Sequence, residues 1–329
     1  MKGVIIEGPG KLEVKEFETP EISLPEEVLV KVEGCGVCGT DIHLYQGLEF
    51  AKYPVIPGHE FVGKIIRMGK TAEKYFKVGD RVAIDPNLPC YVCQECRKGR
   101  YNLCSNMVNI GVNKDGGFAE YTVVNYKQIY RVPLGLDLKI AVLAEPVSCI
   151  IHGIEKGNLQ FDDKVLIIGA GPIGILTQKI LENVYGVKEV FVQEINEKRI
   201  ENAQKLGVKN ISKSYSLSFD VIFEMSGSLQ GFEESLKILN KGGILVQFGV
   251  AQENSFAKIN QYSIYKKELN IIGSFVNPYT MAKALMILDA YSPVFSGIVD
   301  KEIETFEELS QILKGEIRTT DFTKAILTY

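Results

Sequence analysis

One run of this chain constrains its fold more than any other: a strand-like segment that ends in closely spaced glycines and opens a helix. Residues 164–171 read KVLIIGAG, and IGILTQKILENVYG follows with helical spacing of its apolar residues. The scheme repeats in VFVQEI before NEKRIENAQKLG, and in FDVIFEMSG before SLQGFEESLKIL. Apolar strands that alternate with helices are typical of a parallel sheet covered on both faces. We therefore predict a doubly wound parallel sheet, to which GGILVQFGV adds a strand.

The glycines of this run match the pattern G-x-G-x-x-G at Gly169, Gly171 and Gly174. In a dinucleotide site the first glycine permits the tight turn, the second admits the pyrophosphate, and the third allows close helix packing. Glu194 ends the next strand 23 positions after Gly171, where a carboxylate binds ribose hydroxyls and repels a 2′-phosphate. The alternative is a structural turn with a solvated Glu194. The strand–loop–helix context favours an NAD site.

The first half of the chain has a different pattern. Short runs such as VLVKV, DRVAI and FAEYTVV read as strands between turn residues. From about residue 282 the tail continues with a helix pattern and ends in the strand-like KAILTY. The length of 329 residues agrees with about two domains.

Composition excludes several function classes. Net charge is −4 and no Lys/Arg block exceeds two residues, which argues against nucleic-acid binding. No apolar run approaches the ~18 residues of a membrane span, and the amino terminus MKGVIIEGPGKLEVKEF lacks a signal-peptide core. Seven cysteines are an odd number, which argues against a disulfide framework. We expect a cytoplasmic protein with reduced cysteines and no membrane or nucleic-acid partner.

Four of the cysteines lie in PCYVCQECRKGRYNLC, residues 89–104. Their spacing is C-x2-C-x2-C-x7-C, and four thiolates this close can bind one tetrahedral Zn²⁺ at about 2.3 Å. Four cysteine ligands leave no open position, so such a site is structural. An iron–sulfur cluster and four unligated thiols are the alternatives. The predicted ligands are Cys90, Cys93, Cys96 and Cys104.

A second set of metal-binding side chains is dispersed over GCGVCGTDIH, PGHEFVG and LAEPVSCIIHG. Cys38, His59, Glu60 and Glu145 together offer one thiolate, one imidazole and one or two carboxylates. That set suits a catalytic zinc with one position left for substrate or water. Each piece alone is weak, because a lone histidine is more often structural and Cys35-x-x-Cys38 also fits redox chemistry.

Taken together, the motifs resemble the zinc-dependent medium-chain dehydrogenases along nearly the whole chain. CGVCGTDIH, PGHEFVG, GGFAEY, the four-cysteine lobe and GAGPIG occur in that family's order, and LAEP is similar to the sorbitol and threonine dehydrogenase branch. The resemblance implies a GroES-like β-rich catalytic domain at 1–148, completed by the tail 282–329. It implies a Rossmann NAD-binding domain at 149–281 and an active site in the cleft. We also expect a homo-oligomer, either a dimer or a tetramer.

The resemblance also implies roles for individual residues. Cys38 and His59 are similar to catalytic zinc ligands, whereas Glu60 and Glu145 bind the metal directly or through water. Thr40 resembles the hydroxyl that takes the substrate proton, and His43 the end of a relay to solvent. Cys35, Cys149 and His152 match no ligand role and read as packing residues. Cofactor contacts are implied at Gly169, Gly171, Pro172, Ile173, Gly174, Glu194, Arg199, Val250, Phe275 and, near the pyrophosphate, Lys324.

These observations predict an enzyme that oxidises a secondary alcohol with NAD⁺, with one catalytic and one structural zinc per chain. The favoured substrate is a polyol or its phosphate, because carboxylates make the zinc environment hard and polar. Threonine or a vicinal diol is the alternative, since GVNKDGGFAEY also resembles threonine dehydrogenases. A zinc-free quinone reductase and an NAD-binding regulator are less favoured. The polar side chains expected at the substrate pocket are Tyr45, Gln46, Glu49, Lys52 and Tyr53.

Overall fold

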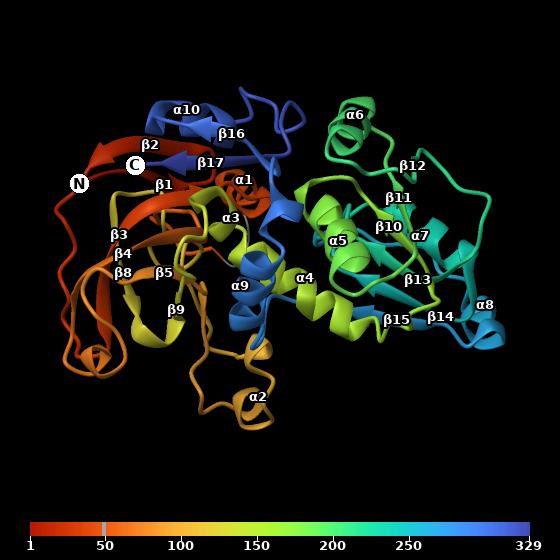
Figure 1. Cartoon of the computed structure of the whole chain (residues 1–329), viewed down its shortest axis with the longest axis horizontal. Helices are drawn as coiled ribbons and strands as arrows, with labels where there is room; N and C mark the ends of the chain where they lie inside the picture. The colour runs from red at the N-terminus through yellow and green to blue at the C-terminus, as the bar shows by residue number, and fades with distance from the viewer. Residues whose placement is uncertain (48–50) are drawn as a thin grey trace. The chain divides into compact units, whose positions relative to one another are not determined.

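The computed structural model describes residues 1–47 and 51–329, and the chain divides into two compact units (Figure 1). The first unit comprises Met1–Pro146, Met281–Ser292 and Val299–Tyr329, and the second comprises Val147–Thr280 and Pro293–Ile298. The domain boundaries expected at 148 and 282 stay predictions. Glu49, expected at the substrate pocket, lies outside the described residues.

The first unit is built on a mixed seven-stranded sheet. Its strand order is β16-β17-β3-β4-β5-β9, and β8 also pairs with β3. The tail strand β17 runs antiparallel to β3, so the last residues of the chain complete a sheet begun near its start. The strands are β3 (Glu27–Gly36), β4 (Glu60–Met68), β5 (Arg81–Ile84), β8 (Tyr121–Asn125), β9 (Ile129–Arg131), β16 (Val299–Ile303) and β17 (Lys324–Thr328).

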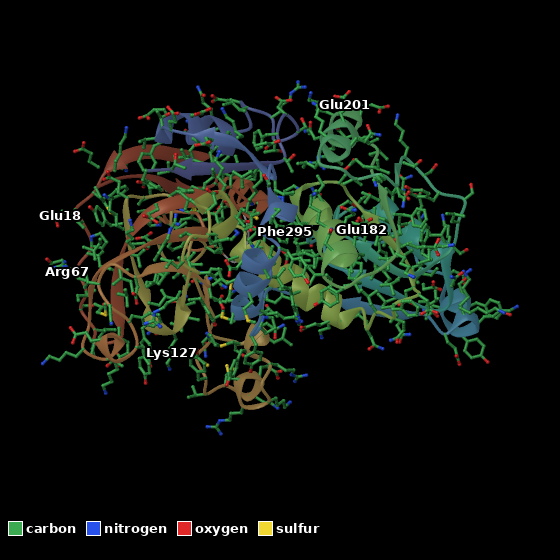
Figure 2. The ribbon with its side chains drawn as sticks, in the orientation of Figure 1. Glu18, Arg67, Lys127, Glu182, Glu201 and Phe295 are labelled. Carbon is green, nitrogen blue, oxygen red and sulfur yellow. The ribbon has the colours of Figure 1, made fainter. Side chains whose placement is uncertain are left out.

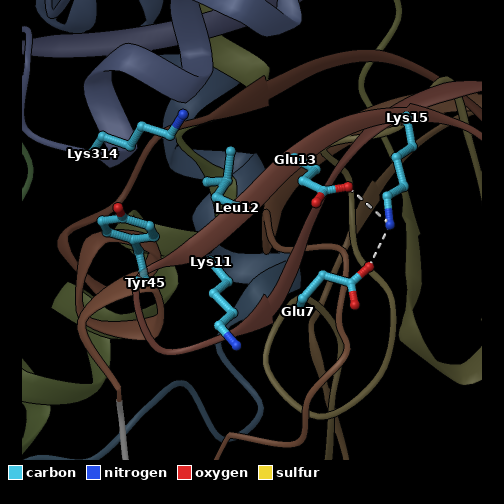
Figure 3. A pocket seen from close by; sticks show the side chains of 8 residues that line it. Glu7, Lys11, Leu12, Glu13, Lys15, Tyr45 and Lys314 are labelled. Atoms are coloured by element: carbon cyan, nitrogen blue, oxygen red, sulfur yellow. Dashed lines mark hydrogen bonds and ion pairs between the residues drawn. The ribbon is translucent and has the colours of Figure 1, made fainter.

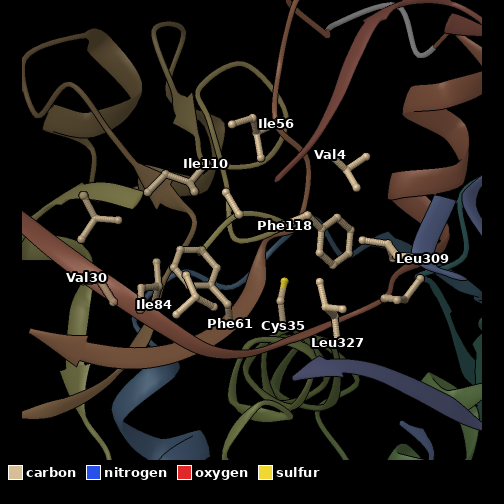
Figure 4. Close-up of a cluster of buried hydrophobic side chains, with 14 of the residues drawn as sticks. Val4, Val30, Cys35, Ile56, Phe61, Ile84, Ile110, Phe118, Leu309 and Leu327 are labelled. Atoms are coloured by element: carbon tan, nitrogen blue, oxygen red, sulfur yellow. The ribbon is translucent and has the colours of Figure 1, made fainter. Parts of the chain in front are cut away.

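A continuous apolar core fills this unit (Figure 4). Phe61 of β4 and Phe118 lie in it with Cys35 of β3, and each is at most 2% exposed. Cys35 therefore occupies a packing position. Smaller elements surround the core: the paired strands β1 (Lys2–Gly8) and β2 (Lys11–Glu16), the paired strands β6 (Asn87–Leu88) and β7 (Val108–Asn109), and the helices α1 (Gly39–Gln46), α2 (Gln94–Arg97), α3 (Leu138–Ala141), α9 (Met281–Ala290) and α10 (Phe306–Leu313).

The second unit confirms the predicted doubly wound sheet. Six parallel strands follow the order β12-β11-β10-β13-β14-β15. The glycine-rich run begins at the central strand β10, four of whose five residues are buried. The strands are β10 (Lys164–Ile168), β11 (Glu189–Gln193), β12 (Ile211–Ser212), β13 (Phe219–Glu224), β14 (Leu239–Gln247) and β15 (Asn270–Gly273).

Helices precede or connect these strands, and most of them have one buried side. Glu182 and Glu201 lie on the exposed sides of α5 and α6 (Figure 2), whereas Ile175 and Ala203 of the same helices are buried. The helices are α4 (Ala144–Lys156), α5 (Pro172–Asn183), α6 (Glu197–Lys205), α7 (Leu229–Ile238) and α8 (Gln261–Lys267). Over residues 1–47 and 51–329, no helix is both long enough and apolar enough to cross a lipid bilayer.

A buried carboxylate joins the loops at the carboxyl ends of three central strands. Glu224 ends β13 with no exposed surface and accepts hydrogen bonds from the N–H groups of Ser226 (3.0 Å) and Gly227 (3.1 Å), and from Nε2 of Gln247 (3.0 Å). Ser226 in turn packs against Gly169 of the glycine loop. Burying an ionised carboxylate is costly unless donors surround it, so Glu224 fixes the position of these loops.

Replacing Glu224 by Ala should therefore lower the free energy of unfolding by about 3 kcal/mol, because several buried donors lose their acceptor. Urea unfolding of Glu224→Ala against the wild type measures the effect. Glu182→Ala, on the exposed side of α5, is the control and should stay within about 0.5 kcal/mol. Equal stability of Glu224→Ala and the control would contradict the assigned role.

Candidate active site and cysteine lobe

Asp41 brings two distant segments of the first unit together. It lies in the first turn of α1, is fully buried, and accepts a hydrogen bond from the N–H of Cys38 at 2.9 Å. Its second oxygen accepts from the N–H of Gly58 at 3.2 Å and lies 3.4 Å from Nδ1 of His59. The carboxylate thus caps the helix and orients the imidazole, which leaves Nε2 of His59 as the nitrogen for a metal.

The resulting side-chain group fits a metal ion. One ligand atom each from Cys38, His59 and Glu60 lie within 4.8 Å of one another. Burial opposes a charge on the imidazole, but Asp41 and Cys38 raise the pKa of His59 well above its usual value. The surroundings of His59 therefore favour a cation, and the donors of the group are one sulfur, one nitrogen and one oxygen. Thiolate, imidazole and carboxylate are all zinc ligands, and three protein ligands leave a fourth position open, as at a catalytic site.

Glu145 and Lys324 are both buried, but they differ in their relation to the metal-binding group. Glu145 is 8% exposed in the first turn of α4 and does not belong to the converged group found among the described residues. Lys324 is 2% exposed, and its ammonium forms an ion pair with Glu60. A zinc contact of Glu145 and a cofactor contact of Lys324 stay predictions.

Thr40 and His43, the predicted proton-transfer residues, both lie on α1. Oγ1 of Thr40 is 3.8 Å from Sγ of Cys38, so this hydroxyl lies beside the metal-binding group. His43 follows three residues later and is exposed. Residues three apart are neighbours on a helix surface, so the pair leads from the site toward solvent.

The polar residues expected at the substrate pocket have several different environments. Tyr45 lines an open pocket of about 580 Å³ together with Leu12 and Lys314 (Figure 3). The hydroxyl of Tyr53 donates to the carbonyl of Leu44 at 2.6 Å. Gln46 and Lys52 are exposed. Contact of these side chains with a substrate stays a prediction.

The cysteine lobe brings its four sulfurs within 4.8 Å of one another. Sγ of Cys104 accepts from the N–H of Cys90 at 3.2 Å, and Sγ of Cys90 accepts from the N–H of Cys93 at 3.3 Å. Backbone donors at Cys96 and Ser105 lower the pKa of Cys93 to about 6, whereas burial raises the pKa of Cys96 to about 12. All seven cysteines are free. The ionised thiolate is the form that binds metal, so the lobe fits one tetrahedral zinc.

The glycine loop has the geometry that its pattern predicts. Gly169 has φ of +105°, a region that side chains rarely adopt, and a Cβ at Gly174 would overlap the carbonyl oxygen of Gly169. No atom lies within 4 Å of the position of a Cβ at Gly171, which is the N-cap of α5, and Pro172 follows at the first helical position. The loop thus presents open backbone at a helix N-terminus, where phosphates bind.

Glu194 links this loop to the end of β11. Its carboxylate accepts from the N–H groups of Ala170, Ile195 and Asn196, each at 2.9 Å, and lies 3.8 Å from Nη1 of Arg199. The carboxylate is therefore held in place rather than solvated. Of the other predicted cofactor contacts, Ile173 is half-buried, and Val250 and Phe275 are exposed by 73% and 56%.

Three features of the site escaped the sequence prediction. Asp41 stands within the motif CGVCGTDIH, and its signal is an acidic residue three positions after a helix N-cap. Glu224 ends an apolar strand just before a glycine turn. The pairing of Lys324 with Glu60 has no local signal, because the two residues come from opposite ends of the chain.

Comparison with known proteins decides the family. Residues 24–134 match the alcohol dehydrogenase GroES-like domain, and residues 172–290 match the zinc-binding dehydrogenase family. D-altritol 5-dehydrogenase of Agrobacterium fabrum is 34% identical over 304 residues, which are 89% of this chain and 90% of the relative. The chain belongs to the zinc-dependent medium-chain dehydrogenase family. This confirms the resemblance drawn from the motifs and the GroES-like plus Rossmann fold, and this member of the family is an alcohol dehydrogenase enzyme.

Other members of the family are also similar over most of their length. L-Threonine 3-dehydrogenase of Coxiella burnetii is 35% identical over 247 residues, which are 69% of this chain and 71% of the relative. A chain from Sinorhizobium meliloti, whose structure holds NADP, aligns with a TM-score of 0.93 at 29% identity. The alignment covers all of this chain and 99% of that one. An alcohol dehydrogenase from Escherichia coli in complex with NADH aligns with a TM-score of 0.91 at 29% identity and the same coverage.

Two metal-binding groups predict two zinc ions per chain with unequal roles. A chelator should remove the zinc of the open Cys38 group first and abolish activity while the fold persists. Cys93→Ser should instead impair folding, because structural zinc contributes folding free energy directly, and Cys149→Ser should change neither. Elemental analysis and circular dichroism measure both effects. Fully active protein with one zinc or none would contradict this assignment.

Proposed function

We propose that this enzyme oxidises a secondary alcohol that carries a neighbouring hydroxyl, a polyol or its phosphate, with NAD⁺ as acceptor. The convergence of Cys38, His59 and Glu60 beside the hydroxyl of Thr40 carries this proposal. The similarity to D-altritol 5-dehydrogenase supports the polyol class. L-Threonine is the second candidate, because an L-threonine 3-dehydrogenase is 35% identical.

The proposed chemistry divides between the metal and the chain. When bound, a catalytic zinc supplies Lewis acidity that lowers the pKa of a hydroxyl. Cys38, His59 and Glu60 would hold it, and Asp41 keeps the His59 ring oriented. Thr40 takes the substrate proton, and the exposed His43 passes it to solvent. The glycine loop and Glu194 would hold the dinucleotide, which would supply the hydride acceptor when bound.

The proposal extends to the setting of the enzyme. A second zinc lies in the cysteine lobe, and the protein is a cytoplasmic homo-oligomer with no nucleic-acid or membrane partner. The seven free cysteines support a reducing compartment. The strand β15 supports self-association, because it ends its sheet and Ile271 on it is 39% exposed. Unpaired edge strands are templates for pairing with a second copy.

Ethanol and other short primary alcohols should be at least ~100-fold poorer than the best polyol in kcat/KM, on the order of 2.7 kcal/mol. A pocket that pairs substrate hydroxyls leaves buried polar groups unsatisfied when an analogue lacks them. The measurement compares sorbitol, galactitol, a polyol phosphate, L-threonine, 2,3-butanediol and ethanol side by side. Ethanol equal to the best of these would refute the polar pocket.

NAD⁺ should exceed NADP⁺ by at least ~10-fold in kcat/KM, which corresponds to about 1.4 kcal/mol. Three backbone N–H groups hold the carboxylate of Glu194, so it cannot swing away from a 2′-phosphate. Glu194→Ser should reduce the preference, whereas Glu201→Gln on the exposed side of α6 should leave it unchanged. Equal kcat/KM of the wild type with NAD⁺ and NADP⁺ would contradict the role of Glu194. The similar chain from Sinorhizobium meliloti is bound to NADP, so both cofactors are compared.

A further inference from the structure

Lys324 and Glu60 form the most deeply buried ion pair in the described part of the chain. Their side chains are 2% and 1% exposed, and the ammonium also donates to the carbonyl of Val37 at 2.8 Å. Buried charges persist only when they are paired, so each of these groups depends on the other.

The sheet is built so that this pair can form. Strand β3 lies between β4, which begins with Glu60, and β17, which begins with Lys324. Gly36 of β3 is in register with Glu60, and a Cβ there would overlap Oε2 of Glu60 and lie 3.2 Å from Cε of Lys324. The glycine thus opens the space in which the two side chains meet.

Glu60 also belongs to the metal-binding group with Cys38 and His59. Its carboxylate therefore has two possible cationic partners, a metal ion and the ammonium of Lys324. The ammonium is buried and is also hydrogen-bonded to the carbonyl of Val37, so it stays beside the group when the metal binds. A fixed positive charge there draws electron density from the carboxylate and repels a second cation.

We propose that Lys324 is a positioning residue that competes with zinc for the Glu60 carboxylate and makes Glu60 a weak, exchangeable ligand. The inference rests on the proposed zinc site. Cys38 and His59 then provide most of the zinc affinity, and the remaining coordination positions stay accessible to substrate or water. Lys324 also partners Glu60 when the metal is absent, which keeps the metal-free protein folded.

The test is the zinc affinity of the labile site, measured by chelator competition in full-length protein with the cysteine lobe loaded. Lys324→Met should bind this zinc at least ~10-fold more tightly. The substitution removes the ammonium that competes with zinc for Glu60, and with it the charge that repels the metal ion. Co²⁺ substitution should show a changed absorption spectrum. Lys324→Arg keeps the positive charge and should therefore have the zinc affinity of the wild type. Lys301→Met, on the neighbouring strand β16 with its own partner Glu308, should leave the affinity unchanged.

A double variant keeps the test decisive if Lys324→Met fails to fold. Glu60→Gln with Lys324→Met is nearly isosteric and neutral, and its zinc affinity should stay within ~10-fold of the wild type. A larger loss of affinity in the double variant would show that Glu60 is a full zinc ligand. Unchanged or weaker zinc binding in Lys324→Met would show that Lys324 does not compete for Glu60. Either result overturns the inference. Wild-type protein that binds no second zinc overturns the proposed function itself.

Discussion

The buried carboxylate of Asp41 is the interaction on which the catalytic group depends. It caps α1 through Cys38, holds the Gly58 N–H, and faces His59. The segments that carry the thiolate and the imidazole are thereby joined by one side chain with no solvent exposure. Because such an anion is tolerated only with donors around it, the local fold and the metal-binding geometry stabilise each other.

In the second unit, two other buried carboxylates join separate segments of the chain as Asp41 does in the first. Glu194 ties the end of β11 to the glycine loop, and Glu224 ties the loops after β13 and β14 to each other. Ligands of doubly wound sheets bind at the carboxyl ends of the strands. The backbone there must adopt irregular paths, and buried acceptors satisfy the N–H groups that strands and helices leave unpaired.

Local patterns predicted the parts of the molecule that local physics controls. The apolar strands and the glycine pattern predicted the parallel sheet, because the spacing of apolar residues and the residues of a turn can both be read from neighbouring positions. The spacing of the four cysteines predicted a cluster for the same reason. Lys324 shows the limit: its ion pair with Glu60 depends on sheet pairing between the two ends of the chain, which no local pattern carries. Asp41 and Glu224 were missed because a capping or loop-bridging role depends on partners that only the fold brings near.

The central claim is that Cys38, His59 and Glu60 hold a catalytic zinc distinct from the zinc of the cysteine lobe. A crystal structure of the purified enzyme with anomalous data collected across the zinc edge tests it most directly. The account predicts two peaks per chain, one at bonding distance from Cys38 Sγ and His59 Nε2 and one among the four lobe cysteines. A single peak in the lobe, with none beside Cys38 in active enzyme, would contradict it.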